Sequence, residues 1–177
     1  MSATLSGLFD WSGLATDLWV LLARARSAPA PLGHHDQPWF GLWQEFEQAA
    51  EVGVAEAAAL ELLDIARQRA HEAGVVRECL YLVALVELGR ARPGDEPVAS
   101  PTFDELNATH QETLAAALEL TERELTRSIT NEVRAMLAHC LIVFLGNQQE
   151  ITKSLAANRE SGQSVRSKRS NRKPADR

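Results

Sequence analysis

Apolar residues recur at helical spacing along most of this chain, in stretches that Pro, Gly and polar residues separate. The clearest stretch places Trp39, Leu42, Trp43, Phe46 and Ala50 at positions i, i+3, i+4, i+7 and i+11, which is the stripe of an amphipathic helix. No stretch alternates apolar and polar residues as a half-buried strand does. The pattern predicts six helices, at about 11–25, 38–52, 54–73, 75–90, 103–127 and 130–158.

Residues that favour helix ends stand at several of the predicted boundaries. Asp36 precedes the second helix, and Ser128 or Thr130 is placed to cap the sixth. Gly74 suits the position just after the third helix. Gly146, followed by Asn147, is a site where the sixth helix either ends or kinks.

The stretch 133–145 is predicted to be the central helix of the fold. It is apolar nearly all round from Ala135 to Leu145, whereas a surface helix has one apolar stripe. Two interpretations stay open: the helix is buried on every side, or it is half buried and half part of an oligomer interface. We expect the similar apolar run 79–86 to pack against it. It is too short to span a bilayer, which needs about 20 apolar residues.

These elements predict an all-α fold: a single-domain bundle of about six helices with a disordered basic C-terminal tail. A chain of 177 residues is typical of one domain. We expect a flexible N-terminus at 1–9, the helical domain at 10–158 and the tail at 159–177. The tail lacks apolar residues that would pack on the bundle, so it is expected to be disordered when alone.

Charge divides the chain into two unlike parts. The net charge is −6, but residues 159–177 contain seven basic and two acidic residues, so the tail carries +5 and the remainder −11. The tail is predicted to contact nucleic-acid phosphates or an acidic partner; a solvated tail without a specific partner is the third interpretation. The residues that would make these contacts are Arg166, Lys168, Arg169, Arg172 and Lys173.

Several other chemistries find little support in the residues. Cys79 and Cys140 lie in apolar runs, as reduced core cysteines of a cytosolic protein do. The N-terminal residues do not resemble a secretory signal, so we expect a cytoplasmic protein. Histidines are not at metal-ligand spacing and glycines form no phosphate-binding loop, so no metal, cofactor or small-molecule substrate is expected.

One spacing is typical of catalysis. Arg134 and His139 form an Arg-x4-His motif that resembles the Arg-x(4–6)-His motif of HEPN-type ribonucleases, which are small helical bundles. The resemblance implies RNA cleavage by a dimer in which the two side chains meet in a cleft. A polar residue usually follows the Arg in that family, and here Ala135 does. The competing interpretation is an Arg that reaches solvent and a His at the edge of the core.

The third and fourth predicted helices form a helical hairpin that resembles a tetratricopeptide-type unit over about 35 residues. The positions that carry the resemblance are Ala59, Leu60, Leu62, Ala66, Arg67, Ala70, Gly74, Leu80, Leu85, Leu88 and Gly89. The preceding helix pair does not repeat the pattern, although stacked repeats are needed for stability. A generic helical hairpin is the other interpretation.

From these observations we expect a non-enzymatic interaction or regulatory protein that self-associates or binds a protein partner. The partner surface would be the aromatic helix with Trp39, Trp43 and Phe46, or the central helix, and the basic arm would add electrostatic anchoring. The alternatives are a HEPN-like ribonuclease that uses Arg134 and His139, and a helical-repeat adaptor.

Overall fold

The computed structural model describes residues 16–33, 35–47, 52–90, 101–127 and 129–170. This part of the chain contains six α-helices and no β-strand, so the predicted all-α bundle is confirmed. The helices are α1 (Thr16–Ala25), α2 (Trp39–Glu47), α3 (Val52–Gln68), α4 (Ala73–Arg90), α5 (Pro101–Leu125) and α6 (Asn131–Ser170). None of these helices is both long and apolar enough to cross a bilayer.

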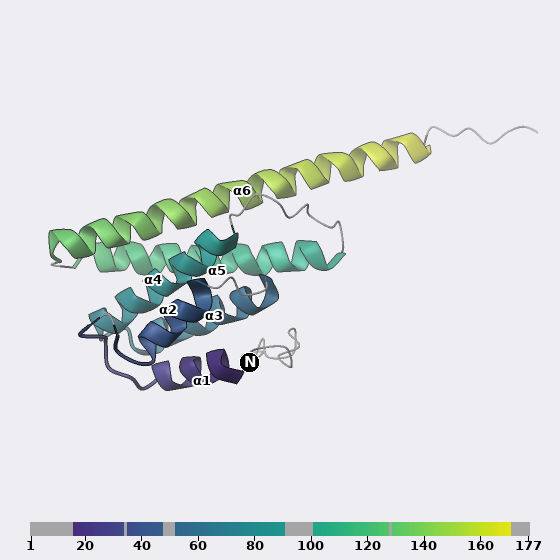
Figure 1. Ribbon diagram of the computed structural model, residues 1–177. Helices are drawn as coiled ribbons and strands as arrows, with labels where there is room; N and C mark the ends of the chain where they lie inside the picture. Colours follow the sequence, from purple (N-terminus) through teal and green to yellow (C-terminus); the bar gives the residue numbers. More distant parts are fainter. Residues whose placement is uncertain (1–15, 34, 48–51, 91–100, 128, 171–177) are drawn as a thin grey trace, which may run out of the picture.

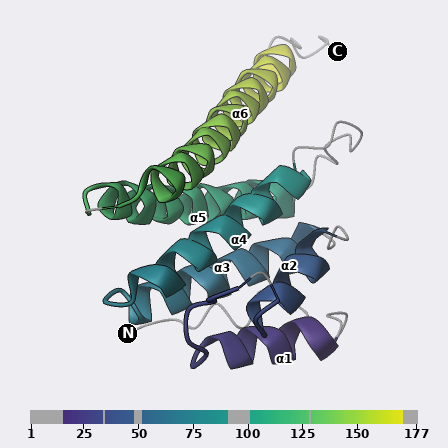
Figure 2. The same cartoon turned by 60° about the vertical axis from the view of Figure 1, so that its left-hand side comes forward.

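Successive helices run in opposite directions and form three stacked hairpins. Each hairpin packs its own two helices together: α1 on α2, α3 on α4, and α5 on α6. Contacts also join α1 to α3 and α3 to α5, and α2 to α4 and α4 to α6. The two views show this as a layered stack with α1 at one side and α6 at the other (Figures 1 and 2). As a result, α2, α4 and α6 all begin at the same end of the molecule.

The core lies where these layers meet, with α4 at its centre. Buried Leu and Ile side chains of α3 pack on buried Val and Leu side chains of α4. The predicted contact between the run 79–86 and the central helix is present, because α4 packs on α6 and the Cys140 thiol lies 3.8 Å from the Leu80 carbonyl oxygen. Both cysteines are buried and reduced.

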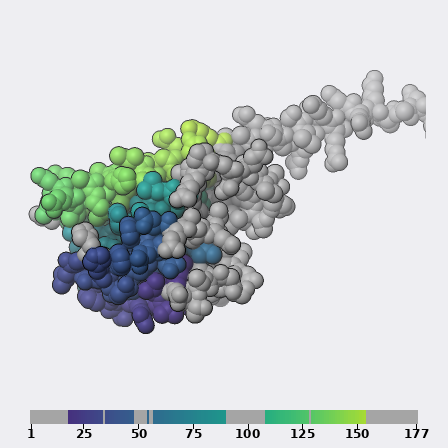
Figure 3. Space-filling model, viewed as in Figure 1, coloured from purple at the N-terminus to yellow at the C-terminus, as the bar shows by residue number. Residues whose placement is uncertain are grey.

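The central helix is half buried, so the prediction that 133–145 is buried on every side is wrong. That its exposed half belongs to an oligomer interface stays a prediction. Leu137, Cys140 and Phe144 are fully buried, whereas Ile142 is 70% exposed and Leu145 is 46% exposed. In the space-filling view, the first part of α6 (green) forms the edge of the molecule opposite α1 (Figure 3). Its outer side therefore faces solvent.

Helix α6 is longer than the sequence pattern suggested. It passes through Gly146 without ending and continues to Ser170, so its backbone extends into the segment expected to be a tail. Its last turns project past the end of α5 (Figure 1). A helical segment without neighbours is marginal in water, because tertiary packing supplies most of the stability of helices in proteins.

Of the polar residues at predicted helix starts, Thr130 caps its helix and Asp36 does not. Asp36 does not cap α2; its carboxylate accepts hydrogen bonds from the backbone N–H groups of Leu32 and Gly33, at 2.7 and 3.0 Å, and so closes the loop before that helix. Thr130 caps α6, because its hydroxyl accepts a hydrogen bond from Val133 N–H at 3.3 Å. Ser128 lies outside the described residues.

Gly74 also differs from the prediction. Helix α3 already ends at Gln68, and Gly74 lies in the first turn of α4 instead of after α3. A Cβ atom at this position would lie 2.7 Å from the Cβ of Ala30. The glycine is therefore needed for close packing of α4 against the α1–α2 loop.

Arg69 joins this loop to the α3–α4 turn. Its guanidinium donates hydrogen bonds to the carbonyl oxygens of Ala25 and Ala28 and to both carboxylate oxygens of Glu72. The hydrogen bond with Glu72 raises the pKa of Arg69 and lowers the pKa of Glu72. Arg69 thus provides a hydrogen-bond donor for a carbonyl group at the end of α1 and for another in the loop that follows.

Candidate functional site

A groove with a volume of about 910 Å³ lies at the end of the molecule where α2, α4 and α6 begin. The α1–α2 loop contributes Pro31, Leu32, Gly33 and His35 to its wall. The helices contribute Trp39, Phe40, Trp43, Gly74, Arg77, Glu78, Tyr81, Val133 and Met136. Binding pockets in proteins typically have volumes of about 300–1,000 Å³ and mostly apolar walls, so this groove has the size and character of a binding site.

Aromatic rings form one wall of the groove. Phe40 and Trp43 are stacked, with ring centroids 5.9 Å apart and an angle of 16° between the ring planes. The His35 ring meets Phe40 edge-on, with centroids 4.8 Å apart. Phe40 and Trp43 are each only half-buried, as is Tyr81 of α4. These rings retain apolar surface that a bound group would remove from water.

Only part of the partner surface that was predicted on the aromatic helix is accessible in the structure. Trp39 is 2% exposed and Phe46 is 5% exposed, so both are core residues, although Trp39 also lines the groove. The indole N–H of Trp39 donates to the Pro29 carbonyl oxygen at 2.7 Å and so holds the α1–α2 loop. Of the three predicted residues, Trp43 has the most accessible ring.

Three residues that line the groove were not predicted as site residues from the sequence: Phe40, Tyr81 and Met136. Phe40 lies outside the stripe formed by Trp39, Leu42 and Phe46, and an aromatic residue beside a complete stripe is a signal for a second contact surface. Tyr81 and Met136 come from helices far away in sequence. Their proximity depends on how α4 and α6 pack, which no local pattern shows.

Arg77, one of the residues that line the groove, belongs to a cluster of three charged side chains. Arg77 of α4 donates from Nε to the Oε2 atom of Glu124 at 3.3 Å, and Glu124 of α5 is fully buried. Arg127 Nε lies 3.1 Å from the other oxygen of Glu124, and Arg127 also donates to the Ala70 carbonyl oxygen at 2.9 Å. Two cations therefore compensate one buried carboxylate, and this contact holds Arg77 in place at the groove.

The two residues of the catalytic-looking motif are both exposed on α6. Arg134 and His139 lie five positions apart, which places them about 140° apart around the helix axis. They therefore point in different directions within one copy of the chain. His139 lies beside the exposed Ile142 on the outer side of α6.

The predicted basic arm lies only partly within the described chain. The backbone of Arg166, Lys168 and Arg169 belongs to α6, but their side chains are outside the described part. Arg172 and Lys173 lie outside the described residues altogether. The arm's chemistry therefore rests on its sequence.

A buried polar cluster joins three helices away from the groove. Glu87 of α4 is fully buried, and its Oε2 atom lies 2.6 Å from Nε2 of His110 on α5. Asn147 of α6 donates to the same oxygen at 2.8 Å and to the Glu87 backbone carbonyl at 3.1 Å. This explains why a polar Asn follows the apolar stretch of α6: it satisfies a carboxylate in the core.

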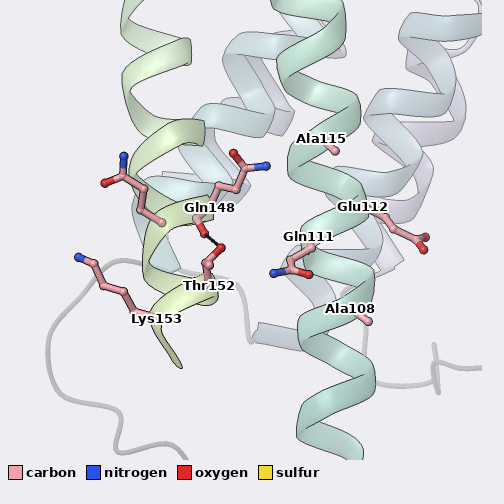
Figure 4. A pocket seen from close by; sticks show the side chains of 8 residues that line it. Ala108, Gln111, Glu112, Ala115, Gln148, Thr152 and Lys153 are labelled. Atoms are coloured by element: carbon pink, nitrogen blue, oxygen red, sulfur yellow. Dashed lines mark hydrogen bonds between the residues drawn. The ribbon is translucent and has the colours of Figure 1, made fainter. Parts of the chain in front are cut away.

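A second, shallower groove of about 700 Å³ runs between α5 and α6. Gln111 of α5 and Thr152 of α6 point toward each other across it, and Thr152 donates to the Gln148 carbonyl oxygen at 2.8 Å (Figure 4). Glu112 and Lys153 point away from it. Because its lining combines amide groups with small alanines and has no aromatic residue, it offers a bound group fewer anchors than the first groove.

Within the described residues, no group of three or more His, Cys, Asp and Glu side chains is arranged to hold a metal ion. Burial raises the pKa of the Cys140 thiol to about 12 and also raises that of Cys79, so both remain protonated at neutral pH.

No protein-family model, curated protein or solved structure matches the chain.

Proposed function

We propose that this chain is a non-enzymatic interaction protein that binds an apolar, aromatic-containing segment of a partner protein in the groove between α2, α4 and α6. The observation that carries the proposal is the half-buried wall formed by Phe40, Trp43 and Tyr81 in a groove of about 910 Å³. Aromatic residues dominate the binding energy of protein interfaces, because they bury a large area with little loss of conformational freedom.

The groove is also held in shape before any partner arrives. Asp36 closes the loop at its rim, Trp39 bonds to the Pro29 carbonyl, and Arg77 is fixed by buried Glu124. A rigid site avoids the free-energy cost of ordering on binding, so more of the gain from burying the rings appears as affinity. Met136, with its flexible thioether, can adjust to the shape of an apolar side chain.

A selection experiment tests the groove directly. Peptides selected on the wild-type protein and counter-selected on Trp43→Glu are expected to contain apolar and aromatic anchors. Trp43→Glu or Phe40→Glu should weaken the selected peptides by at least about tenfold, since each change places a charge against the apolar anchor. Fluorescence anisotropy measures the affinity, and circular dichroism checks that each variant is folded.

Trp19→Glu is the matched control, because Trp19 is a 47% exposed aromatic residue on α1, away from the groove. It should leave peptide affinity unchanged. Selection that enriches no peptide over the Trp43→Glu background, or equal affinity for all three variants and the wild type, would contradict the proposal.

The basic arm is proposed to add electrostatic attraction to an acidic partner or to nucleic acid. Its net charge of +5 contrasts with −11 on the rest of the chain, which disfavours broad contact between the body and phosphates. Removal of 159–177 should flatten the dependence of log affinity on log salt, because each lost phosphate contact reduces that slope. An unchanged slope would exclude the arm from binding.

The three stacked hairpins favour a particular form of this proposal, a helical-repeat adaptor. In such proteins, each hairpin contacts its neighbours and the stack presents an extended surface. The contacts α2–α4–α6 place residues of three hairpins in one groove. An adaptor joins two partners, so two different selected peptides should bind simultaneously in isothermal titration calorimetry; strict competition between every pair would favour a single-site protein.

A HEPN-like ribonuclease is the second candidate function, and the exposure of both Arg134 and His139 favours it. Imidazole titrates near neutral pH and guanidinium pairs with phosphate oxygens. Incubation of labelled RNA with the wild type and with His139→Ala tests this candidate. His71→Ala is the control, because the His71 side chain is 79% exposed in the α3–α4 turn. Equal cleavage by the wild type and His139→Ala would end this candidate.

A further inference from the structure

We infer that the outer side of α6 is an interface between two antiparallel copies of this chain. This surface is separate from the groove between α2, α4 and α6, so the inference goes beyond the proposed function. Ile142 is 70% exposed and Leu145 is 46% exposed, the two most apolar exposed positions of this helix. Ala138 and Ala135 continue the same exposed row one and two turns before Ile142.

The spacing of this row fits helix-to-helix pairing. Successive residues of the row lie three, four and three positions apart, which is the alternation of a and d positions in a coiled coil. These residues are Ala135, Ala138, Ile142 and Leu145. The row continues as the exposed residues Gln149 and Thr152, which also line the shallow groove between α5 and α6, so the row ends at the border of that groove. The space above it is open, since a Cβ atom added at Gly146 would meet no other atom within 4 Å. The segment 131–153 thus offers a contact about 34 Å long.

The occupant is a second copy because the charges beside the row complement themselves. Glu132 and Lys153 lie three heptads apart, so both fall on the same flank of the row. In an antiparallel pair with Ile142 opposite Leu145 of the other copy, like flanks face each other, and Glu132 of each copy comes beside Lys153 of the other. The existing pair of Lys153 with Glu150 is highly exposed and so exchanges readily.

A parallel pair lacks this complementarity. Opposite flanks would face each other, which sets Lys153 against Gln148 and Arg134 against His139. The two basic arms, each with a net charge of +5, would also run side by side at the C-terminal ends of α6. The antiparallel arrangement sends the arms to opposite ends of the dimer, where their repulsion is small.

The first experiment measures association by sedimentation velocity from micromolar to millimolar concentration, using the full chain. The wild type is expected to dimerise, and Ile142→Glu to weaken the dimer by at least about tenfold because it buries a charge in the seam. Val20→Glu is the matched control, since Val20 is a 40% exposed apolar residue on α1. A wild-type monomer at every concentration, or a dimer that Ile142→Glu does not weaken, overturns the inference.

Charge-reversal variants test the dimer even if Ile142→Glu fails to fold. Glu132→Lys and Lys153→Glu should each weaken the dimer, by roughly threefold to tenfold, and the double variant should restore it, because the pair is re-formed with its signs exchanged. Two weak single variants without restoration in the double variant contradict the antiparallel pairing.

Disulfide trapping reports the orientation. In the antiparallel pair Ala138 lies opposite Gln149 of the other copy, so Ala138→Cys/Gln149→Cys should oxidise to a covalent dimer, whereas neither single variant should. In a parallel pair, Ala138→Cys alone would cross-link to itself, and that result overturns the proposal. The native thiols do not interfere, because Cys79 and Cys140 are fully buried. A dimer that is weakened by Trp43→Glu but not by Ile142→Glu would place the second copy in the groove instead.

Discussion

The two sides of α6 carry similar side chains in very different surroundings. On the inner side, Leu137, Cys140 and Phe144 are fully buried against α4 and α5. On the outer side, Ile142 and Leu145 stand largely in water. The residues of both sides are apolar, so composition alone does not separate them. The difference teaches that the number of layers in the stack, and not the hydrophobicity of the helix, decides which apolar side chains form the core.

The largest effect expected from this comparison is on unfolding. Phe144→Ala should lower the free energy of unfolding by about 3–5 kcal/mol, because it removes a fully buried ring and leaves a cavity. Ile142→Ala should change it by less than about 0.5 kcal/mol in dilute solution, where no second copy covers it. Urea denaturation measures both. Equal losses would show that the outer side is buried in the monomer as well.

Thiol chemistry gives the next largest contrast. Because the pKa of Cys140 is raised to about 12, its reaction with Ellman's reagent at pH 8 should be slower than that of a cysteine placed at Ala138, by a factor on the order of 10³. The Cys140 rate should rise about tenfold per pH unit up to pH 10, whereas the Ala138→Cys rate should level off above its ordinary pKa near 8.5. The Cys140 rate is measured in a Cys79→Ala variant, so that Cys79 does not contribute to the signal.

The same thiols predict a loss of stability in alkali. Their pKa values are higher in the folded state than in the unfolded chain, so their contribution is fully present below about pH 8.5 and decreases as the pH rises from there toward the folded value. Urea midpoints between pH 7 and pH 10 measure the effect, with Cys140→Ala as the control for this site. A flat profile would mean that Cys140 is accessible to solvent.

A smaller effect is expected at the polar residue of the inner side. Asn147→Ala should destabilise the protein by about 1–3 kcal/mol, because it removes two hydrogen bonds to buried Glu87. Gln149→Ala is the control on the outer side, where Gln149 is exposed, and should be nearly neutral. A neutral Asn147→Ala would indicate that water replaces the amide in the cluster with Glu87 and His110.

Substitution of two glycines by alanine is expected to change the free energy of unfolding in opposite directions. Gly74→Ala should destabilise by about 1–3 kcal/mol, since the new methyl group would lie 2.7 Å from the Ala30 Cβ. Gly146→Ala should stabilise by about 0.5–1 kcal/mol, because Ala is the better helix former and the site is open. Thermal unfolding of both variants at low concentration provides the measurement. Destabilisation by Gly146→Ala in the monomer would show that a neighbour approaches the outer side.

The helices were predictable from the sequence, but the wall of the groove was not. The stripe of Trp39, Leu42 and Phe46 correctly predicted an amphipathic helix, because the helical period is a local property. The sequence did not distinguish the anchoring role of Trp39 from the accessible ring of Trp43. Phe40 of α2, Tyr81 of α4 and Met136 of α6 line one groove only because the three hairpins stack in register.

The sequence by itself determined that the chain forms helices, that α3 and α4 make a hairpin, and that charge separates an acidic body from a basic arm. Periodicity, turn residues and charge act over a few neighbours, so they can be read along the chain. The tertiary structure alone decided which side of α6 is buried, that Asn147 and His110 meet Glu87, and that Gly74 must lack a side chain. These outcomes depend on close packing between residues distant in sequence, where one methyl group or one hydrogen bond changes the result.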